Sequence, residues 1–403
     1  MIFGLALLFL GGLLAGRLCR QLRLPPLLGM LLLGIALGPY ALDLLDDSLL
    51  SISADLRRIA LVIILTRAGL SLDLDSLKRV GRPAFLLCFL PAVCEICAIV
   101  ILAPRILGLH PMEALLLGTI LAAVSPAVVV PHMVHLMESG YGVQQGIPQM
   151  ILAGASIDDI FVLGLFSVCT NLMSGGSFSP LELIRLPLSL IFGILAGILG
   201  ALVLRRVFAY FESSAQRVVL LLAVSFLLLF IDDCMNGAFS GLLAIMTLAI
   251  ALAKQIPIKE ISAHYNNLWA GAEPILFVLV GASVNISYAA NSSLPVLLVI
   301  AGALLFRMLG VLLCTAKTHL LARERIFCML SYTPKATVQA AIGAIPLSLG
   351  FPCGQTVLTA AVLSILLTAP LGAIAIHTTY RKLLAPPSHH AETKNSQESS
   401  CEP

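Results

Sequence analysis

Apolar runs alternate with short polar or basic stretches along almost the whole chain. A helix that crosses a bilayer needs about 20 mostly apolar residues, with about 17 to 25 as the usual range. The pattern therefore predicts an all-α polytopic membrane protein, followed by a polar, disordered tail at 380–403. We place thirteen transmembrane helices at residues 2–16, 25–39, 56–71, 83–104, 112–134, 147–170, 181–204, 218–232, 237–253, 270–287, 294–316, 326–349 and 354–379.

The composition supports the same class. Hydrophobic residues make up 59% of the 403 residues, charged residues make up 11%, and the mean hydropathy is +1.02. A soluble domain carries about 25% charged residues. No nucleotide-binding motif is present, and the ten cysteines are scattered, mostly within apolar segments, so we read them as small buried residues. We therefore expect membrane lipids as neighbours, no cofactor and no nucleic-acid partner.

Basic residues mark one side of the membrane. Most of the 24 Lys and Arg residues fall in the odd-numbered loops and the tail, whereas the even-numbered loops hold only Arg105. Cytoplasmic loops carry the excess of Lys and Arg. The pattern therefore predicts an N-terminus outside the cell and a C-terminus in the cytoplasm.

Two of the predicted helices carry proline in the middle of an apolar run, in a related pattern. Ser125-Pro126-x-x-x-Val130 matches Thr333-Pro334-x-x-x-Val338 at an offset of 208 residues. Proline removes a backbone hydrogen bond and opens a helix. Interrupted helices at corresponding places in two halves are typical of transporters built from inverted repeats. We expect one transporter domain over 1–379, with repeat one at about 1–170, a linker helix at 181–204 and repeat two at about 218–379.

Two adjacent carboxylates, Asp158 and Asp159, lie near the middle of the apolar segment 147–170. A charge at the bilayer centre costs from about 3 to more than 10 kcal/mol, so ionisable residues there indicate function. A monovalent cation and a proton would compete for these oxygens. Ser156, on the same helical face as Asp159, and the backbone freed around Ser125 could complete the ligand shell.

Three more charged residues are expected at membrane depth, namely Glu95, Arg307 and Lys335. We interpret Glu95 and Arg307 as a structural pair, and Lys335 as a charge that offsets the negative ends of half-helices. If Glu95 engages Arg307, Asp158 has no assigned counter-charge. The alternative is a purely structural aspartate pair neutralised by Lys335 and Arg307. A second pair, Asp232 and Asp233, falls at a helix end where water can solvate it, and we leave it outside the site.

Several stretches resemble the monovalent cation/proton antiporter superfamily, most closely the NHA-type branch of sodium/hydrogen exchangers and its bacterial relatives. The matching stretches are LPPLLGMLLLGIALGP at 24–39, IALVIILTRAGLSLD at 59–73, VSPAVVVPHMVHLMESGYGVQQGIPQMILAGASIDDI at 124–160, ILFVLVGASVNI at 275–286 and SYTPKATVQAAIGAIPLS at 331–348.

The resemblance implies a homodimer whose protomers each contain a dimerisation domain and a mobile core with crossed broken helices. It implies that Asp159 is the main ion ligand and that Asp158 modulates it. Many bacterial members carry a lysine where this chain has Arg307; in the NHA-type branch this arginine pairs with a glutamate at the position of Glu95. The resemblance also implies a bacterial inner membrane location.

We therefore predict a Na⁺ (or Li⁺)/H⁺ antiporter rather than an enzyme, with Na⁺ held at Asp159 and Asp158. A K⁺/H⁺ antiporter is the nearest alternative, because an aspartate pair does not reveal ion size. A sodium-coupled symporter or a channel of similar fold is more remote. An intramembrane aspartyl protease needs aspartates on two separate helices, whereas neighbours on one helix point about 100° apart.

Overall fold

The chain forms helices throughout the part that the structure describes. This computed structural model describes residues 1–22, 24–72, 81–175, 180–235 and 239–386, except the side chains of 156, 175 and 180–187. Three of the basic loop residues behind the predicted orientation, Arg23, Lys78 and Arg79, and the tail beyond residue 386 lie outside the described residues.

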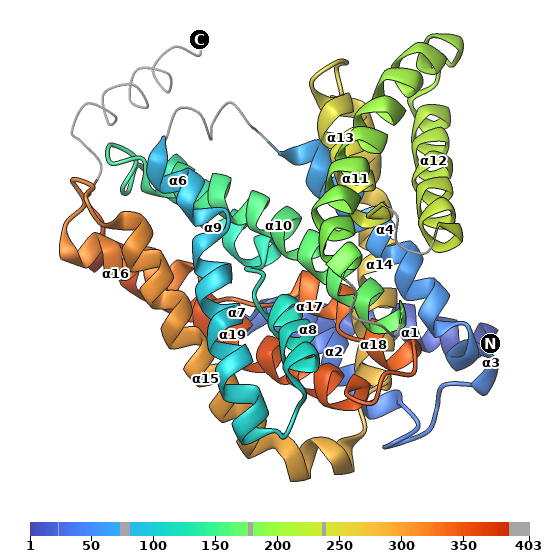
Figure 1. Cartoon of the computed structure of the whole chain (residues 1–403), viewed down its shortest axis with the longest axis horizontal. Helices are drawn as coiled ribbons and strands as arrows, with labels where there is room; N and C mark the ends of the chain where they lie inside the picture. Colours follow the sequence, from blue (N-terminus) through green and yellow to red (C-terminus); the bar gives the residue numbers. More distant parts are fainter. Residues whose placement is uncertain (23, 73–80, 176–179, 236–238, 387–403) are drawn as a thin grey trace, which may run out of the picture.

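The helices pack as two bundles. The core bundle comprises α6 (Arg82–Leu87), α7 (Leu90–Ile106), α8 (Pro111–Leu121), α9 (Pro126–Ser139), α10 (Ile147–Gly175), α15 (Ile286–Thr315), α16 (Ala322–Ser331), α17 (Thr337–Ile342), α18 (Ile345–Ser348) and α19 (Gly354–Leu383). The scaffold bundle comprises α1 (Ile2–Gln21), α2 (Pro26–Leu37), α3 (Asp47–Ser51), α4 (Ser53–Ser71), α11 (Pro180–Val207), the 3₁₀ turn η1 (Phe208–Tyr210), α12 (Ser214–Cys234), α13 (Gly241–Ala253) and α14 (Lys259–Ala282). Figure 1 shows α15 and α16 of the core on one side of the molecule and α12 of the scaffold on the other.

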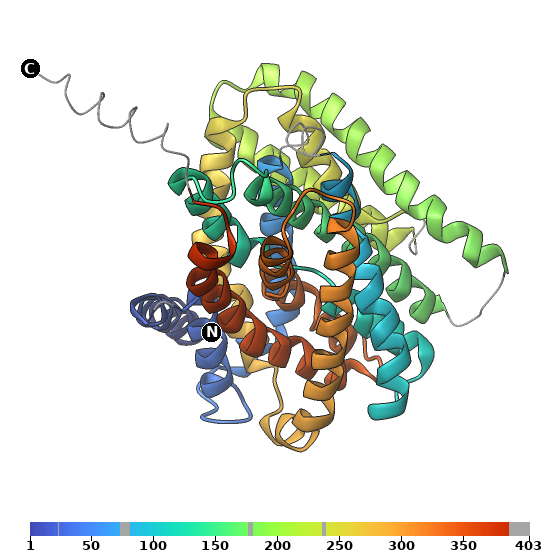
Figure 2. The ribbon, with the colours of Figure 1, turned by 90° about the vertical axis from the view of Figure 1, so that its left-hand side faces the viewer.

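The outward surface is apolar, as expected of a protein in lipid. Exposed leucine, isoleucine and phenylalanine side chains lie along α1, α11, α12 and α15. Figure 2 shows α1 (dark blue) and α11 (bright green) on opposite sides of the molecule. Eight described helical stretches are long and apolar enough to cross a membrane, and three shorter apolar helices accompany them. The chain is therefore an integral membrane protein.

The remaining predicted segments correspond to α4 and α14, which are less apolar. Thirteen crossings and the inverted repeats stay predictions. Several boundaries differ from the prediction. The segment expected at 83–104 is divided between α6 and α7, because Pro91, in the first turn of α7, has no N–H to donate to the preceding turn. Most of the segment expected at 270–287 belongs to α14, which already begins at Lys259 and ends at Ala282, and the last two residues of the segment begin α15.

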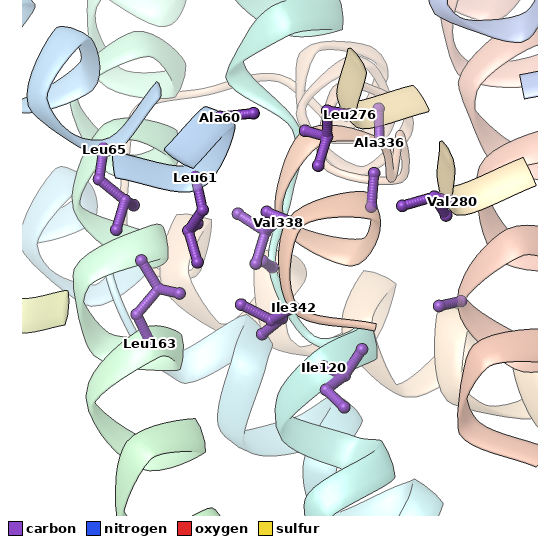
Figure 3. Close-up of a cluster of buried hydrophobic side chains, with 14 of the residues drawn as sticks. Ala60, Leu61, Leu65, Ile120, Leu163, Leu276, Val280, Ala336, Val338 and Ile342 are labelled. Carbon is purple, nitrogen blue, oxygen red and sulfur yellow. The ribbon is translucent and has the colours of Figure 1, made fainter. Parts of the chain in front are cut away.

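An apolar contact joins the two bundles (Figure 3). Scaffold residues from α4 and α14 face core residues from α8, α10 and α17, and all of them are buried. We call this set the interface cluster: Ala60, Leu61, Leu65, Leu276, Val280, Ile120, Leu163, Ala336, Val338 and Ile342.

Candidate functional site

The two proline-interrupted helices meet where each is broken. α8 ends at Leu121 and α9 begins at Pro126, while α16 ends at Ser331 and α17 begins at Thr337. The backbone N–H of Ser125 donates to the carbonyl of Pro334 at 2.8 Å. Pro126 stands at the first position of α9, where its missing N–H costs nothing. Pro126 and Pro334 thus lie at the two helix breaks, and the breaks contact each other.

The broken end of α8 has carbonyl groups that no following turn can satisfy. The side-chain amide of Gln339, in α17, donates to the carbonyls of Ala123 at 2.8 Å and Ile120 at 3.2 Å. Arg307 donates to the carbonyl of Ala122. Two side chains from the second half of the chain therefore cap a helix in the first half.

Four buried charged side chains form one network beside this cap. Arg307 Nη1 lies 2.8 Å from Glu95 Oε2, and Arg307 Nη2 lies 2.9 Å from Asp158 Oδ2. Lys335 Nζ lies 2.6 Å from Glu95 Oε2. None of the four residues is more than 1% exposed. The guanidinium of Arg307 thus bridges two carboxylates, and Glu95 bridges two bases.

This network corrects the expectation that Glu95 would leave Asp158 without a counter-charge. Arg307 has five N–H donors, so it pairs with Glu95 and Asp158 at the same time. Asp158 Oδ2 also accepts the backbone N–H of Val124, at 2.9 Å, in the break after α8. Asp158 is therefore anchored to the broken helix and to the guanidinium. Lys335, expected at the half-helix ends, contacts Glu95, whereas Gln339 and Arg307 cap those ends.

Asp159 has a different environment from its neighbour. It is 5% exposed, and among the described residues it makes no ion pair. Its Oδ1 atom has no hydrogen-bond partner in the described part of the chain. Adjacent residues of a helix point about 100° apart, so α10 turns Asp159 away from the bases that hold Asp158. A bare carboxylate in this position is strongly disfavoured.

The buried charges do not cancel. Glu95, Asp158 and Asp159 contribute three negative charges when ionised, and Arg307 and Lys335 contribute two positive charges. The excess is one negative charge, and the contacts place it on Asp159. This arrangement can bind one proton or one monovalent cation.

The two serines predicted as ligands are only partly located. Ser125 is buried at the helix contact, where its hydroxyl lies 3.5 Å from that of Thr337. Ser156 belongs to α10, but its side chain lies outside the described residues. Among the described residues no group of three or more His, Cys, Asp or Glu could hold a metal ion. A Na⁺ ion at Asp159 would therefore need backbone or hydroxyl oxygens in addition.

Sequence reasoning missed Gln339, and its role is testable. Gln339→Leu should lower the free energy of unfolding by about 1–3 kcal/mol, because it leaves buried carbonyls of α8 unpaired. Thermal unfolding of the purified protein measures this loss. Gln355→Leu is the matched control, since the amide nitrogen of Gln355 is buried without a partner among the residues that the structure describes. Equal losses in the two variants would contradict the capping role.

Known proteins resemble this chain along most of its length. The transmembrane sodium/hydrogen exchanger family matches residues 5–382. Sodium/hydrogen exchanger 9B2 of Homo sapiens is 32% identical over 425 residues, covering 98% of this chain and 78% of that protein. Sodium/hydrogen exchanger 9B1 of Homo sapiens is 33% identical over 408 residues, covering 95% and 78%. The sodium proton antiporter MjNhaP1 from Methanocaldococcus jannaschii, solved at pH 8, has a TM-score of 0.80 at 23% identity, covering 94% of this chain and 97% of that chain.

Proposed function

The chain belongs to the sodium/hydrogen exchanger family, and on that premise we propose that it exchanges Na⁺ or Li⁺ for protons by alternating access. The observation that carries the proposal is the single excess carboxylate of Asp159, buried beside an anchored Asp158. A proton or a cation neutralises the same group, so the two compete for it.

Competition becomes antiport through the cost of moving an empty site. The core bundle would carry Asp159 past the apolar interface cluster, which offers no group to stabilise a bare charge. Binding of a proton or a cation removes that charge. The loaded core therefore moves more readily than the empty core, and net movement of one ion requires the return of the other.

The broken helices supply the other ion ligands in this proposal. The contact between the breaks leaves backbone groups near Asp158 and Asp159, and unwound backbone carbonyls coordinate Na⁺ in transporters of this kind. Arg307 and Val124 hold Asp158 in place. In this proposal Asp158 fixes the position of the neighbouring Asp159, and Asp159 is the main ligand of the transported ion. Ser125 and Ser156 are the side-chain hydroxyls assigned to the shell.

The function is tested in vesicles containing the purified protein and a pH-sensitive dye. An imposed pH gradient should collapse on addition of Na⁺ or Li⁺ and stay intact in protein-free vesicles. Response to K⁺ alone would contradict the ion assignment. Proton leakage without any added cation would indicate a channel instead of an exchanger.

The charge count predicts one-for-one exchange. Asp158 stays paired with Arg307, so only the Asp159 site alternates between one proton and one cation. Each cycle then moves no net charge. A potassium diffusion potential set with valinomycin should leave the Na⁺-dependent rate unchanged. Acceleration by an inside-negative or an inside-positive potential would show that a second proton or ion moves.

We further propose the assembly and orientation that the sequence indicates. The protein would form a homodimer, with the scaffold bundle providing the dimer contact and the core bundle moving against it. The N-terminus would lie outside a bacterial inner membrane and the C-terminus in the cytoplasm, as the loop arginines and lysines indicate.

A further inference from the structure

A cavity of about 610 Å³ lies between the two bundles, away from the buried charge network. Scaffold residues of α4, α12 and α13 form one wall, and core residues of α10, α17 and α18 form the other. Neither the two aspartates of the site nor their bases line it. Leu61, which lines the cavity, also belongs to the interface cluster. A volume of this size suits a small organic ligand.

The cavity wall combines an apolar surface with a few polar groups. Leu61, Phe166, Leu229, Leu242 and Ile345 contribute apolar surface, and Ser167, Thr170, Asn171, Ser174 and Ser348 contribute hydroxyl and amide groups. Such a lining favours a ligand with an apolar body and one polar end.

Most of the charges around the cavity already have partners. Arg58 pairs with Asp233 at 2.6 Å, and both side chains are about half exposed. Asp232 accepts the first backbone N–H of α13, from Gly241, at 2.9 Å. Asp55, in the first turn of α4, is exposed.

Arg57 is the buried charge of the cavity lining without an ionic partner among the described residues. It lines the cavity, is only 9% exposed, and within the described residues makes no ion pair. Its one hydrogen bond in that part of the chain goes from Nη1 to the hydroxyl of Ser283, at 2.6 Å. The other guanidinium donors have no partner among the described residues. Arg57 also lies near the N-terminal end of α4, where the helix dipole adds positive charge. A guanidinium in such surroundings favours an anion, and a carboxylate can accept two of its donors at once.

We propose that this cavity binds an amphipathic organic monocarboxylate, with its carboxylate on Arg57 and its apolar body against Leu61 and Phe166. The ligand would contact both bundles and oppose their relative movement. Binding itself is independent of the exchange reaction. Only the expected inhibition rests on the proposed function.

Binding is tested with 4-phenylbutyrate on the detergent-purified protein. The unfolding temperature is measured against ligand concentration, because a ligand that binds only the folded state raises it. We expect a saturable rise with 4-phenylbutyrate and a clearly smaller rise with the neutral analogue 4-phenyl-1-butanol. In vesicles, the carboxylate should inhibit Na⁺-dependent proton movement over the same concentration range.

Two variants locate the anion site. Arg57→Gln should weaken 4-phenylbutyrate binding by about ten-fold or more, since it removes a charge-assisted contact. Arg58→Gln is the matched control, in the same cavity but already paired with Asp233, and should bind almost as the unchanged protein does. If Arg57→Gln does not fold, Arg57→Lys, which keeps the charge without the planar fork, should show an intermediate affinity.

Three outcomes would overturn the proposal. Equal effects of the acid and the alcohol would show that no anion is recognised. Equal loss in the Arg57 and Arg58 variants would place the carboxylate elsewhere. Unaltered binding after Arg57→Gln, with a lowered unfolding temperature, would show that Arg57 serves only to fix the end of α14 through Ser283. Binding without inhibition would leave the site in place and contradict only its effect on exchange.

Discussion

Replacing Asp159 with asparagine should abolish cation-dependent proton movement, reducing it to the level of protein-free vesicles. Asparagine has nearly the same shape as aspartate but can neither ionise nor exchange a proton for Na⁺. The excess negative charge of the site, which the contacts place on Asp159, disappears with this change. The measurement is the collapse of a pH gradient on addition of Na⁺ or Li⁺.

The same substitution should not destabilise the fold, which separates lost function from misfolding. Asp159 makes no ion pair in the described part of the chain, and its Oδ1 atom is unpartnered. Removing an uncompensated buried charge should therefore leave the free energy of unfolding unchanged or raise it by about 1 kcal/mol or more. A lowered unfolding temperature would mean that Asp159 has structural partners after all.

Asp158→Asn is the matched control on the same helix. Loss of the Asp158 carboxylate should reduce exchange without abolishing it, or make exchange sensitive to membrane potential. It should also destabilise the protein, because Arg307 would lose one of its two carboxylates. Normal exchange by Asp159→Asn together with inactive Asp158→Asn would reverse the roles assigned to the two aspartates.

Much of this arrangement could be predicted from local features of the sequence. Proline within an apolar run breaks a helix wherever it occurs, so Pro126 and Pro334 marked both interruptions. Two adjacent aspartates in an apolar membrane helix carry a high free-energy cost, so such a pair indicates a functional site. The predicted family is confirmed by the match over residues 5–382, and the antiporter fold by the likeness to MjNhaP1.

The partners within the site could not be predicted in the same way, since they depend on tertiary geometry. Arg307 lies 149 residues from Asp158 and 212 from Glu95 in the chain, and no periodicity shows that one guanidinium reaches both. A prediction that gives each charged residue one partner pairs Arg307 with Glu95 and leaves Asp158 without a base. Gln339 was missed for a related reason: a glutamine in an apolar helix becomes informative only when the carbonyls beside it are seen.

Replacing Arg307 with alanine should destabilise the protein more than any other single change in the site, by about 3–5 kcal/mol. The change strands Asp158 and leaves Glu95 with Lys335 alone. It also removes the donors to the carbonyls of Tyr332 and Ala122. The yield of folded protein in detergent and its unfolding temperature measure the loss.

Arg58, a half-exposed arginine of the scaffold bundle, provides the comparison for the cost of losing a buried ion pair. Arg58→Ala breaks an ion pair that water can solvate, and should cost less than about 1 kcal/mol.

Glu95→Ala should also lower the folded yield, because it leaves Lys335 buried without its carboxylate. In contrast, adding Asp158→Asn to Arg307→Ala should recover part of the stability, since the carboxylate stranded by the loss of Arg307 is gone. If Arg307→Ala instead leaves the unfolding temperature intact and eliminates exchange, the guanidinium acts directly on the transported ion, and the structural role assigned to it is wrong.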